Sequence, residues 1–157
     1  MSTNRIGLDT AKATQLSEKL NTLLANYQIF YMNVRGYHWN IQGPEFFELH
    51  VKFEEHYNDL LLKVDELAER ILTLGHRPLH AFSDYIATSE IKEDKQVSEG
   101  KACVEGLLAG YKTIIQMQRS IMELAGEADD EGTAALMSDY ISQQEKTVWM
   151  LSAYLGR

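Results

Sequence analysis

The stretch Pro44–Leu74 decides the fold and reads PEFFELHVKFEEHYNDLLLKVDELAERILTL. It contains no glycine, and no proline after its first residue, whereas Gly75 and Pro78 follow it closely. Proline near the first turn and glycine just past the end are typical of a single long helix. We therefore predict one long helix over these residues.

A helical wheel at about 100° per residue divides this helix into three faces. The first face is apolar, as expected of the stripe that a helix turns to the core of its own bundle. The second face is charged, and we expect it to face water. The first face consists of Phe53, Tyr57, Leu60, Val64, Leu67 and Ile71. The second face consists of Glu48, Lys52, Glu55, His56, Asp59, Lys63, Glu66 and Arg70.

The third face combines a second apolar stripe with ionisable side chains. A second stripe is expected to be buried against another surface, and ionisable groups within it would then need pairing or a bound cation. A solvated edge of an ordinary amphipathic helix is the alternative explanation. The apolar residues of this face are Phe47, Val51, Leu61, Leu62, Ala68 and Leu72. Its ionisable residues are His50, Glu54, Asp65 and Glu69.

The spacing of these ionisable residues suggests where a cation would bind. His50 and Glu54 are one helical turn apart, as are Asp65 and Glu69, so each pair could hold a metal ion. The two pairs lie about 22 Å apart along the axis, too far to hold one ion. An antiparallel copy of the helix, crossing near residues 59–60, would bring the first pair of one chain to the second pair of the other. The hypothesis is two identical metal sites across a dimer interface.

The composition indicates a single soluble globular domain. The chain has 157 residues, of which 45% are hydrophobic and 24% charged, and its net charge is −8. That charge argues against a general nucleic-acid surface and suits a protein that attracts cations. The single cysteine, Cys103, excludes an internal disulfide and fits a reducing compartment. No segment resembles a membrane span or a signal peptide, so we expect a cytoplasmic protein.

Three further long helices are predicted. Apolar residues recur at helical spacing over residues 10–38, 96–125 and 132–155. Residues 1–9 are predicted to be a mobile segment that precedes a domain over residues 10–157. Two short hairpin loops and one long crossover match the ferritin-like variant of the four-helix bundle. The predicted fold class is therefore an all-α, ferritin-like four-helix bundle.

The remaining histidines differ in their expected positions. The loop over residues 39–43 is short, so the first two helices run antiparallel and His38 lies near His50 as a further candidate ligand. His76 and His80 lie in the crossover and are expected to be surface loop residues.

The candidate ligands are two imidazoles and three carboxylates. This set suits Fe(II), with Mn(II) or Zn(II) able to compete. A di-iron centre inside one bundle uses Glu-x-x-His pairs. The chain has no such pair and no histidine after His80, so we do not expect an internal centre.

Three motifs resemble the Dps family, the mini-ferritins named as DNA-binding proteins from starved cells. They are Tyr37-His38-Trp39-Asn40, Phe46-Phe47-x-Leu49-His50 and Asp65-Glu66-x-Ala68-Glu69-Arg70. The resemblance spans nearly the whole chain. It implies a ferritin-like bundle with a short helix in the crossover, near residues 83–89, and a hollow shell of twelve subunits.

The resemblance also implies a ferroxidase activity. Iron would be oxidised at the two-fold interfaces, with hydrogen peroxide as the preferred oxidant, and ferric mineral would be stored inside the shell. His38 and His50 would bind iron from one subunit, and Asp65 and Glu69 from its partner. Glu54 stands where the family more often has aspartate.

Two further features of the family have counterparts here. Trp39 resembles a tryptophan proposed to intercept radicals, although interface packing would also account for it. The acidic turn that contains Asp130 and Glu131 resembles the family's iron-entry pore. A solvated connecting turn is the alternative.

DNA binding is expected to be weak or absent. Family members that bind DNA strongly often use a basic tail, whereas the first fifteen residues here contain only Arg5 and Lys12, offset partly by Asp9. A strongly negative shell would be repelled by DNA phosphates. A DNA-compacting structural protein with an incidental metal site is the alternative function, and an inert scaffold or zinc-binding oligomer is a third.

Overall fold

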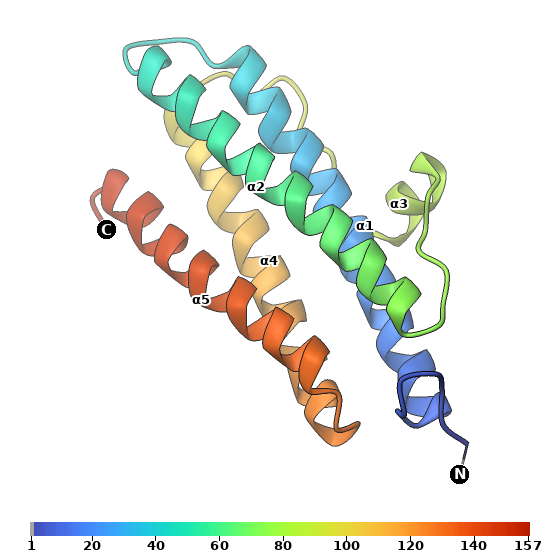
Figure 1. Ribbon diagram of the computed structural model, residues 1–157. Coiled ribbons are helices and arrows are strands. Elements are labelled where there is room, and N and C mark those ends of the chain that lie inside the picture. The colour runs from blue at the N-terminus through green and yellow to red at the C-terminus, as the bar shows by residue number, and fades with distance from the viewer. Residues whose placement is uncertain (1) are drawn as a thin grey trace.

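The computed structural model describes residues 2–157, which contain five helices and no strand. The helices are α1 (Thr10–Asn40), α2 (Phe46–Thr73), α3 (Phe82–Thr88), α4 (Gly100–Glu127) and α5 (Glu131–Tyr154). Figure 1 shows two long hairpins, α1 with α2 and α4 with α5, and the short α3 beside α1. The predicted all-α class is confirmed. No described helix combines the length and apolar character needed to cross a membrane.

The core lies where the four long helices meet. The first face of α2 enters it as predicted, with Phe53, Leu60 and Leu67 fully buried. On α4, Gly110 lies against the ring of Phe30, which occupies the space that a Cβ atom would need. Glycine therefore allows α1 and α4 to approach closely at this level.

The end of α2 follows the predicted glycine signal. Gly75 has a φ of +94°, which side-chain-bearing residues rarely adopt. Its N–H donates to the carbonyl of Leu72 at 2.9 Å, and the N–H of His76 donates to that of Ile71 at 3.1 Å. These two bonds form a Schellman motif, which satisfies carbonyl groups that the end of the helix would otherwise leave unpaired.

Several helix boundaries differ from the predicted ones. α2 begins at Phe46, so Pro44 lies before the helix rather than in its first turn. α4 begins at Gly100 instead of Gln96, because Gln96 has a φ of +60° and cannot belong to a right-handed helix. α1 extends to Asn40, whose side-chain amide donates to a carbonyl in the preceding turn.

Residues 2–9 contain several hydrogen bonds. The Asn4 side chain accepts from the N–H groups of Ile6 and Leu8, and it donates to the carbonyl of Leu74 at the end of α2. The first two bonds close a local turn, and the third links the segment to the bundle. The mobility predicted from the sequence stays a prediction that hydrogen exchange would measure.

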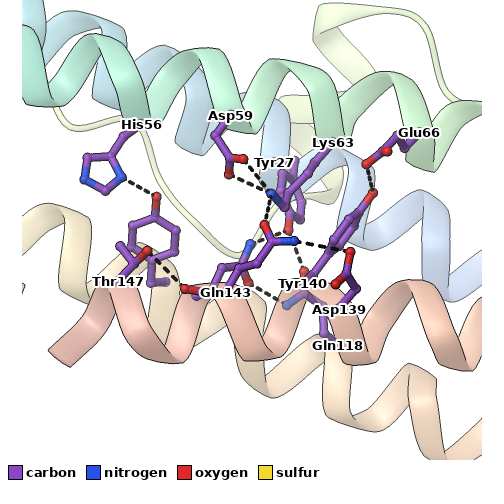
Figure 2. A network of polar contacts seen from close by, with 12 residues as sticks. Tyr27, His56, Asp59, Lys63, Glu66, Gln118, Asp139, Tyr140, Gln143 and Thr147 are labelled. Carbon is purple, nitrogen blue, oxygen red and sulfur yellow. Dashed lines mark hydrogen bonds and ion pairs between the residues drawn. The ribbon is translucent and has the colours of Figure 1, made fainter. Parts of the chain in front are cut away.

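The expectation that the charged face of α2 faces water is wrong for Lys63, although Glu66 is exposed as predicted. Lys63 is buried, Glu66 accepts a hydrogen bond from Tyr140, and Arg70 donates to Asp130 (Figure 2 shows the first two). Among the four long helices, the close pairs are α1–α2, α4–α5 and α1–α4. Long polar side chains therefore span the wider separation between α2 and α5.

Candidate metal centre

His38 and His50 lie together at one end of the first hairpin. His38 belongs to the last turns of α1 and His50 to the first turns of α2. Their rings stack with centroids 3.8 Å apart and planes 12° from parallel. The short connection between the helices produces this proximity, as the sequence predicts.

The two histidines are held by reciprocal hydrogen bonds. Nδ1 of His38 lies 2.6 Å from the carbonyl oxygen of His50, and Nδ1 of His50 lies 2.7 Å from that of His38. A carbonyl oxygen only accepts, so each Nδ1 must carry the proton. In each neutral ring the Nε2 lone pair is therefore available to a metal ion, and the backbone fixes the ring's orientation.

Further side chains complete the surroundings of the histidine pair. The ring of Phe46 stacks on His50 at 4.9 Å, and that of Tyr57 meets His38 edge-on at 5.2 Å. An oxygen of Glu54 lies 3.6 Å from Nε2 of His38, and about half of the Glu54 side chain is exposed. The Glu54 carboxylate therefore lies beside His38, whose ring stacks on that of His50, in a single chain.

Asp65 and Glu69 do not join this group. Both are exposed on α2, more than two helical turns beyond Glu54. Within residues 2–157, no three side chains of His, Cys, Asp or Glu from one chain are grouped closely enough to hold a metal ion. A single chain thus places His50 and Glu54 each beside His38 and leaves Asp65 and Glu69 apart.

The second apolar stripe of α2 is exposed in the single chain. We call its five large members the outer stripe. Leu62 is 68% exposed and Phe47 is 78% exposed. The outer stripe consists of Phe47, Val51, Leu61, Leu62 and Leu72, all of which are exposed in the single chain.

An aromatic cluster that sequence reasoning missed adjoins the histidines. The Arg35 guanidinium lies 4.6 Å from the ring centre of Tyr57 and 5.1 Å from that of Trp39. Such contacts are favourable cation–π interactions. Trp39 itself is 59% exposed. Tyr31, Arg35 and Trp39 are one helical turn apart along α1, and this spacing could have predicted that their side chains are in contact.

Asp130, expected from the sequence to line a pore, is held by contacts within the chain. Its side chain is almost completely buried, pairs with Arg70 Nη2 at 2.7 Å and caps α5 by accepting from the N–H of Thr133 at 3.0 Å. A carboxylate held in this way stabilises the start of α5, and a role of Asp130 in a pore stays a prediction. Glu131 is exposed, and its role in a pore stays a prediction.

The other histidines lie apart from the candidate centre. His76 hydrogen-bonds to Thr14 at 3.2 Å, and His80 is exposed. His56, expected to face water, bonds to the Tyr111 hydroxyl at 2.7 Å. Burial, with a smaller contribution from a nearby lysine, lowers the pKa of His56 to about 4, so its ring is neutral at neutral pH.

Comparison with known proteins identifies the family. The ferritin family model, described as a ferritin-like domain, matches residues 17–157. The crystal structure of a Dps protein from Vibrio cholerae has a TM-score of 0.97 and 62% identity, over 99% of this chain and 98% of that one. The chain belongs to the Dps family of ferritin-like proteins.

The name of one curated relative agrees with this assignment. A DNA protection during starvation protein from Porphyromonas gingivalis is 45% identical over 94% of this chain and 93% of its own length. An uncharacterized protein from Haemophilus influenzae is 58% identical over 98% of this chain and 96% of its own. The Vibrio cholerae Dps protein is described as a member of a broad superfamily of ferritin-like diiron-carboxylate proteins. In general terms, Dps membership associates the chain with iron binding and storage and with protection against oxidative damage.

Proposed function

We propose that this protein oxidises Fe(II) and stores the ferric product, at sites that a second copy of the chain completes. In each site, His38, His50 and Glu54 come from one chain, and Asp65 and Glu69 come from the other. The reciprocal hydrogen bonds between the two histidines carry the proposal, because they leave both Nε2 lone pairs available, and that of His38 lies beside the Glu54 carboxylate. Zn(II) or Mn(II) would compete for the same ligands.

The outer stripe supports the pairing of two chains. An antiparallel crossing of two α2 helices would bury its five side chains and bring each half-site to its complement. Burial of apolar surface is the main favourable term in such an association. The resulting dimer is the unit from which we expect a shell of twelve subunits to be built.

Hydrogen peroxide is the proposed oxidant. Each peroxide accepts two electrons and two protons, its O–O bond breaks, and two waters form while two Fe(II) become two Fe(III). Because one peroxide receives both electrons, the one-electron reduction of peroxide, which releases a hydroxyl radical, is avoided. Anionic carboxylates favour the more highly charged Fe(III), so Glu54, Asp65 and Glu69 would stabilise the product.

A cytoplasmic location is part of the proposal. The only cysteine, Cys103, is buried and unpaired, which fits a reducing compartment.

An oxidation assay tests the proposed activity. Fe(II) is added anaerobically, followed by peroxide, and two Fe(II) should be oxidised for each peroxide consumed. His50→Ala and Asp65→Ala should each slow the reaction by about 100-fold or more, since even outer-shell partners of metal ligands contribute 10- to 100-fold. His80→Ala, an exposed histidine outside the candidate centre, is the control. A wild-type rate in both ligand variants would contradict the proposal.

DNA compaction is the second candidate, because curated relatives bear the name DNA protection during starvation protein. The net charge of −8 per chain opposes it. We expect no retention of DNA in a gel-shift assay at about 150 mM salt, where screening still leaves short-range repulsion. Retention at low-micromolar protein would favour DNA compaction instead.

A further inference from the structure

A cavity of about 470 Å³ lies between the charged face of α2, the first half of α4 and the second half of α5. It exists because α2 and α5 are not a close helix pair. Leu49, Val104 and Leu151 give it buried apolar walls. Small-molecule sites in proteins usually measure about 300–1,000 Å³, so the cavity is large enough for a ligand.

His56 presents a hydrogen-bond donor to this cavity. The buried hydroxyl of Tyr111 lies 2.7 Å from Nδ1 of His56 and has no other hydrogen-bond partner within residues 2–157. A buried O–H group is costly to leave without an acceptor, so it donates to Nδ1, and the ring proton is on Nε2. Nε2 points away from this bond (Figure 2) and donates to no residue in the described part of the chain. An oxygen atom of a ligand in the cavity would supply the missing acceptor.

The end of the cavity near Tyr154 carries uncompensated negative charge. Four carboxylates line the cavity, and two of them pair with lysines of α2. The other two, Glu45 and Glu48, are exposed and form no ion pair among residues 2–157. The Tyr154 hydroxyl donates to Glu45 at 2.8 Å, so the end of α5 lies beside these charges. This end of the cavity therefore attracts a cation and repels an anion.

The spacing of the polar groups limits the length of the ligand. Glu48 and His56 are eight residues apart on α2, which is about 12 Å along the helix axis. With a hydrogen bond of about 2.8 Å at each end, the two polar ends of the ligand are roughly 6–7 Å apart. One aromatic ring and a two-carbon chain span such a distance.

We propose that this cavity binds a small organic ammonium ion whose apolar ring carries a hydroxyl group at the opposite end. The ammonium group lies beside Glu45 and Glu48, and the ring packs between the apolar walls. The hydroxyl oxygen accepts from Nε2 of His56. This site goes beyond the proposed function and includes none of the proposed metal ligands.

Titration calorimetry on the metal-free wild-type protein tests the proposal, with tyramine as the probe. One tyramine should bind per chain. Phenethylamine, which lacks the hydroxyl group, and 4-ethylphenol, which lacks the ammonium group, should each bind about tenfold more weakly, because each loses a polar contact. Hydroxyphenylpropionate, which has a carboxylate in place of the ammonium group, should not bind measurably.

Two variants locate the bound probe. Thr147→Phe fills the cavity from α5 and should abolish tyramine binding, with circular dichroism confirming the fold. Glu45→Gln/Glu48→Gln should weaken tyramine by about tenfold, the combined effect of two exposed ion pairs, and leave 4-ethylphenol unaffected. Glu18→Gln/Glu123→Gln removes the same charge at exposed positions outside the cavity and should leave tyramine binding unchanged.

Three results would overturn the inference. The first is no binding of tyramine to the wild-type protein, and the second is equal binding of tyramine and hydroxyphenylpropionate. The third is unchanged tyramine binding in a folded Thr147→Phe chain. The comparison of probes uses the unmodified protein, so it decides the question even if Thr147→Phe is unstable.

Discussion

The charged face of α2 and its outer stripe differ in where their partners come from. On the charged face, Lys63 and Arg70 are held by residues of α5 and of the turn before it, all within the same chain. On the outer stripe, Leu62 and Phe47 are exposed and have no such cover. An ordinary surface helix has one apolar stripe, which is buried, whereas α2 has a second one that is exposed. The comparison teaches that the outer stripe, unlike the charged face, has no cover within the chain, and a second chain is the cover that we propose.

The largest effect is expected from a charge placed on the outer stripe. Leu62→Glu would put a carboxylate into the proposed interface, where an unpaired charge is very costly to bury. We expect the assembly to dissociate to monomers in sedimentation experiments, with the helical circular dichroism retained and peroxide-driven iron oxidation lost. Leu62→Met, which keeps an apolar side chain of similar size, is the control and should assemble normally. An intact shell with Leu62→Glu would show that the outer stripe does not form the interface.

A smaller effect is expected on the charged face. The Asp130 side chain is 1% exposed, so Arg70→Ala would leave a buried carboxylate without its cation. Removing one partner of such a pair costs about 3 kcal/mol of unfolding free energy. Urea denaturation measures this loss of unfolding free energy when Arg70→Ala is added to the monomeric Leu62→Glu chain. In that background, dissociation of the assembly does not contribute to the unfolding free energy.

The exposed pair Arg119–Glu145 gives the matched control for this experiment. Both of its side chains are more than half exposed. Exposed ion pairs contribute less than about 1 kcal/mol, so Arg119→Ala should be nearly neutral. Equal destabilisation by Arg70→Ala and Arg119→Ala would mean that the burial of Asp130 adds nothing to the stability.

The smallest effect on iron oxidation is expected at Trp39. Its ring lies beside Arg35 and outside the group formed by the two histidines and Glu54. Trp39→Phe should therefore change the rate of iron oxidation by less than about twofold, because it removes no ligand. If Trp39 intercepts radicals, spin trapping should detect more hydroxyl radical from the variant. An unchanged spin-trap signal would leave packing as the role of this residue.

The sequence predicts the parts of this comparison that depend on local spacing. The 3.6-residue period identifies the core face of α2 through Phe53, Leu60 and Leu67, and it separates the outer stripe from that face. The short loop between the first two helices places His38 beside His50. These features depend on residues that are close in sequence, so periodicity and loop length are enough to predict them.

The sequence does not predict contacts between distant segments. Lys63 bonds to Gln143, 80 residues away, and Arg70 bonds to Asp130, 60 residues away. Whether a charged side chain faces water or a neighbouring helix depends on the separation of α2 and α5, which no local pattern specifies. The left-handed conformation of Gln96 is likewise set by the crossover and not by the residue type.

Complementation between two inactive variants tests the shared site most directly. His50→Ala and Asp65→Ala chains are unfolded separately, mixed in equal amounts and reassembled. In a mixed dimer one site collects both defects and the other collects neither, so random pairing should restore about one quarter of the wild-type oxidation rate. No recovery, with mixed dimers verified by mass spectrometry, would show that the ligands do not come from two chains.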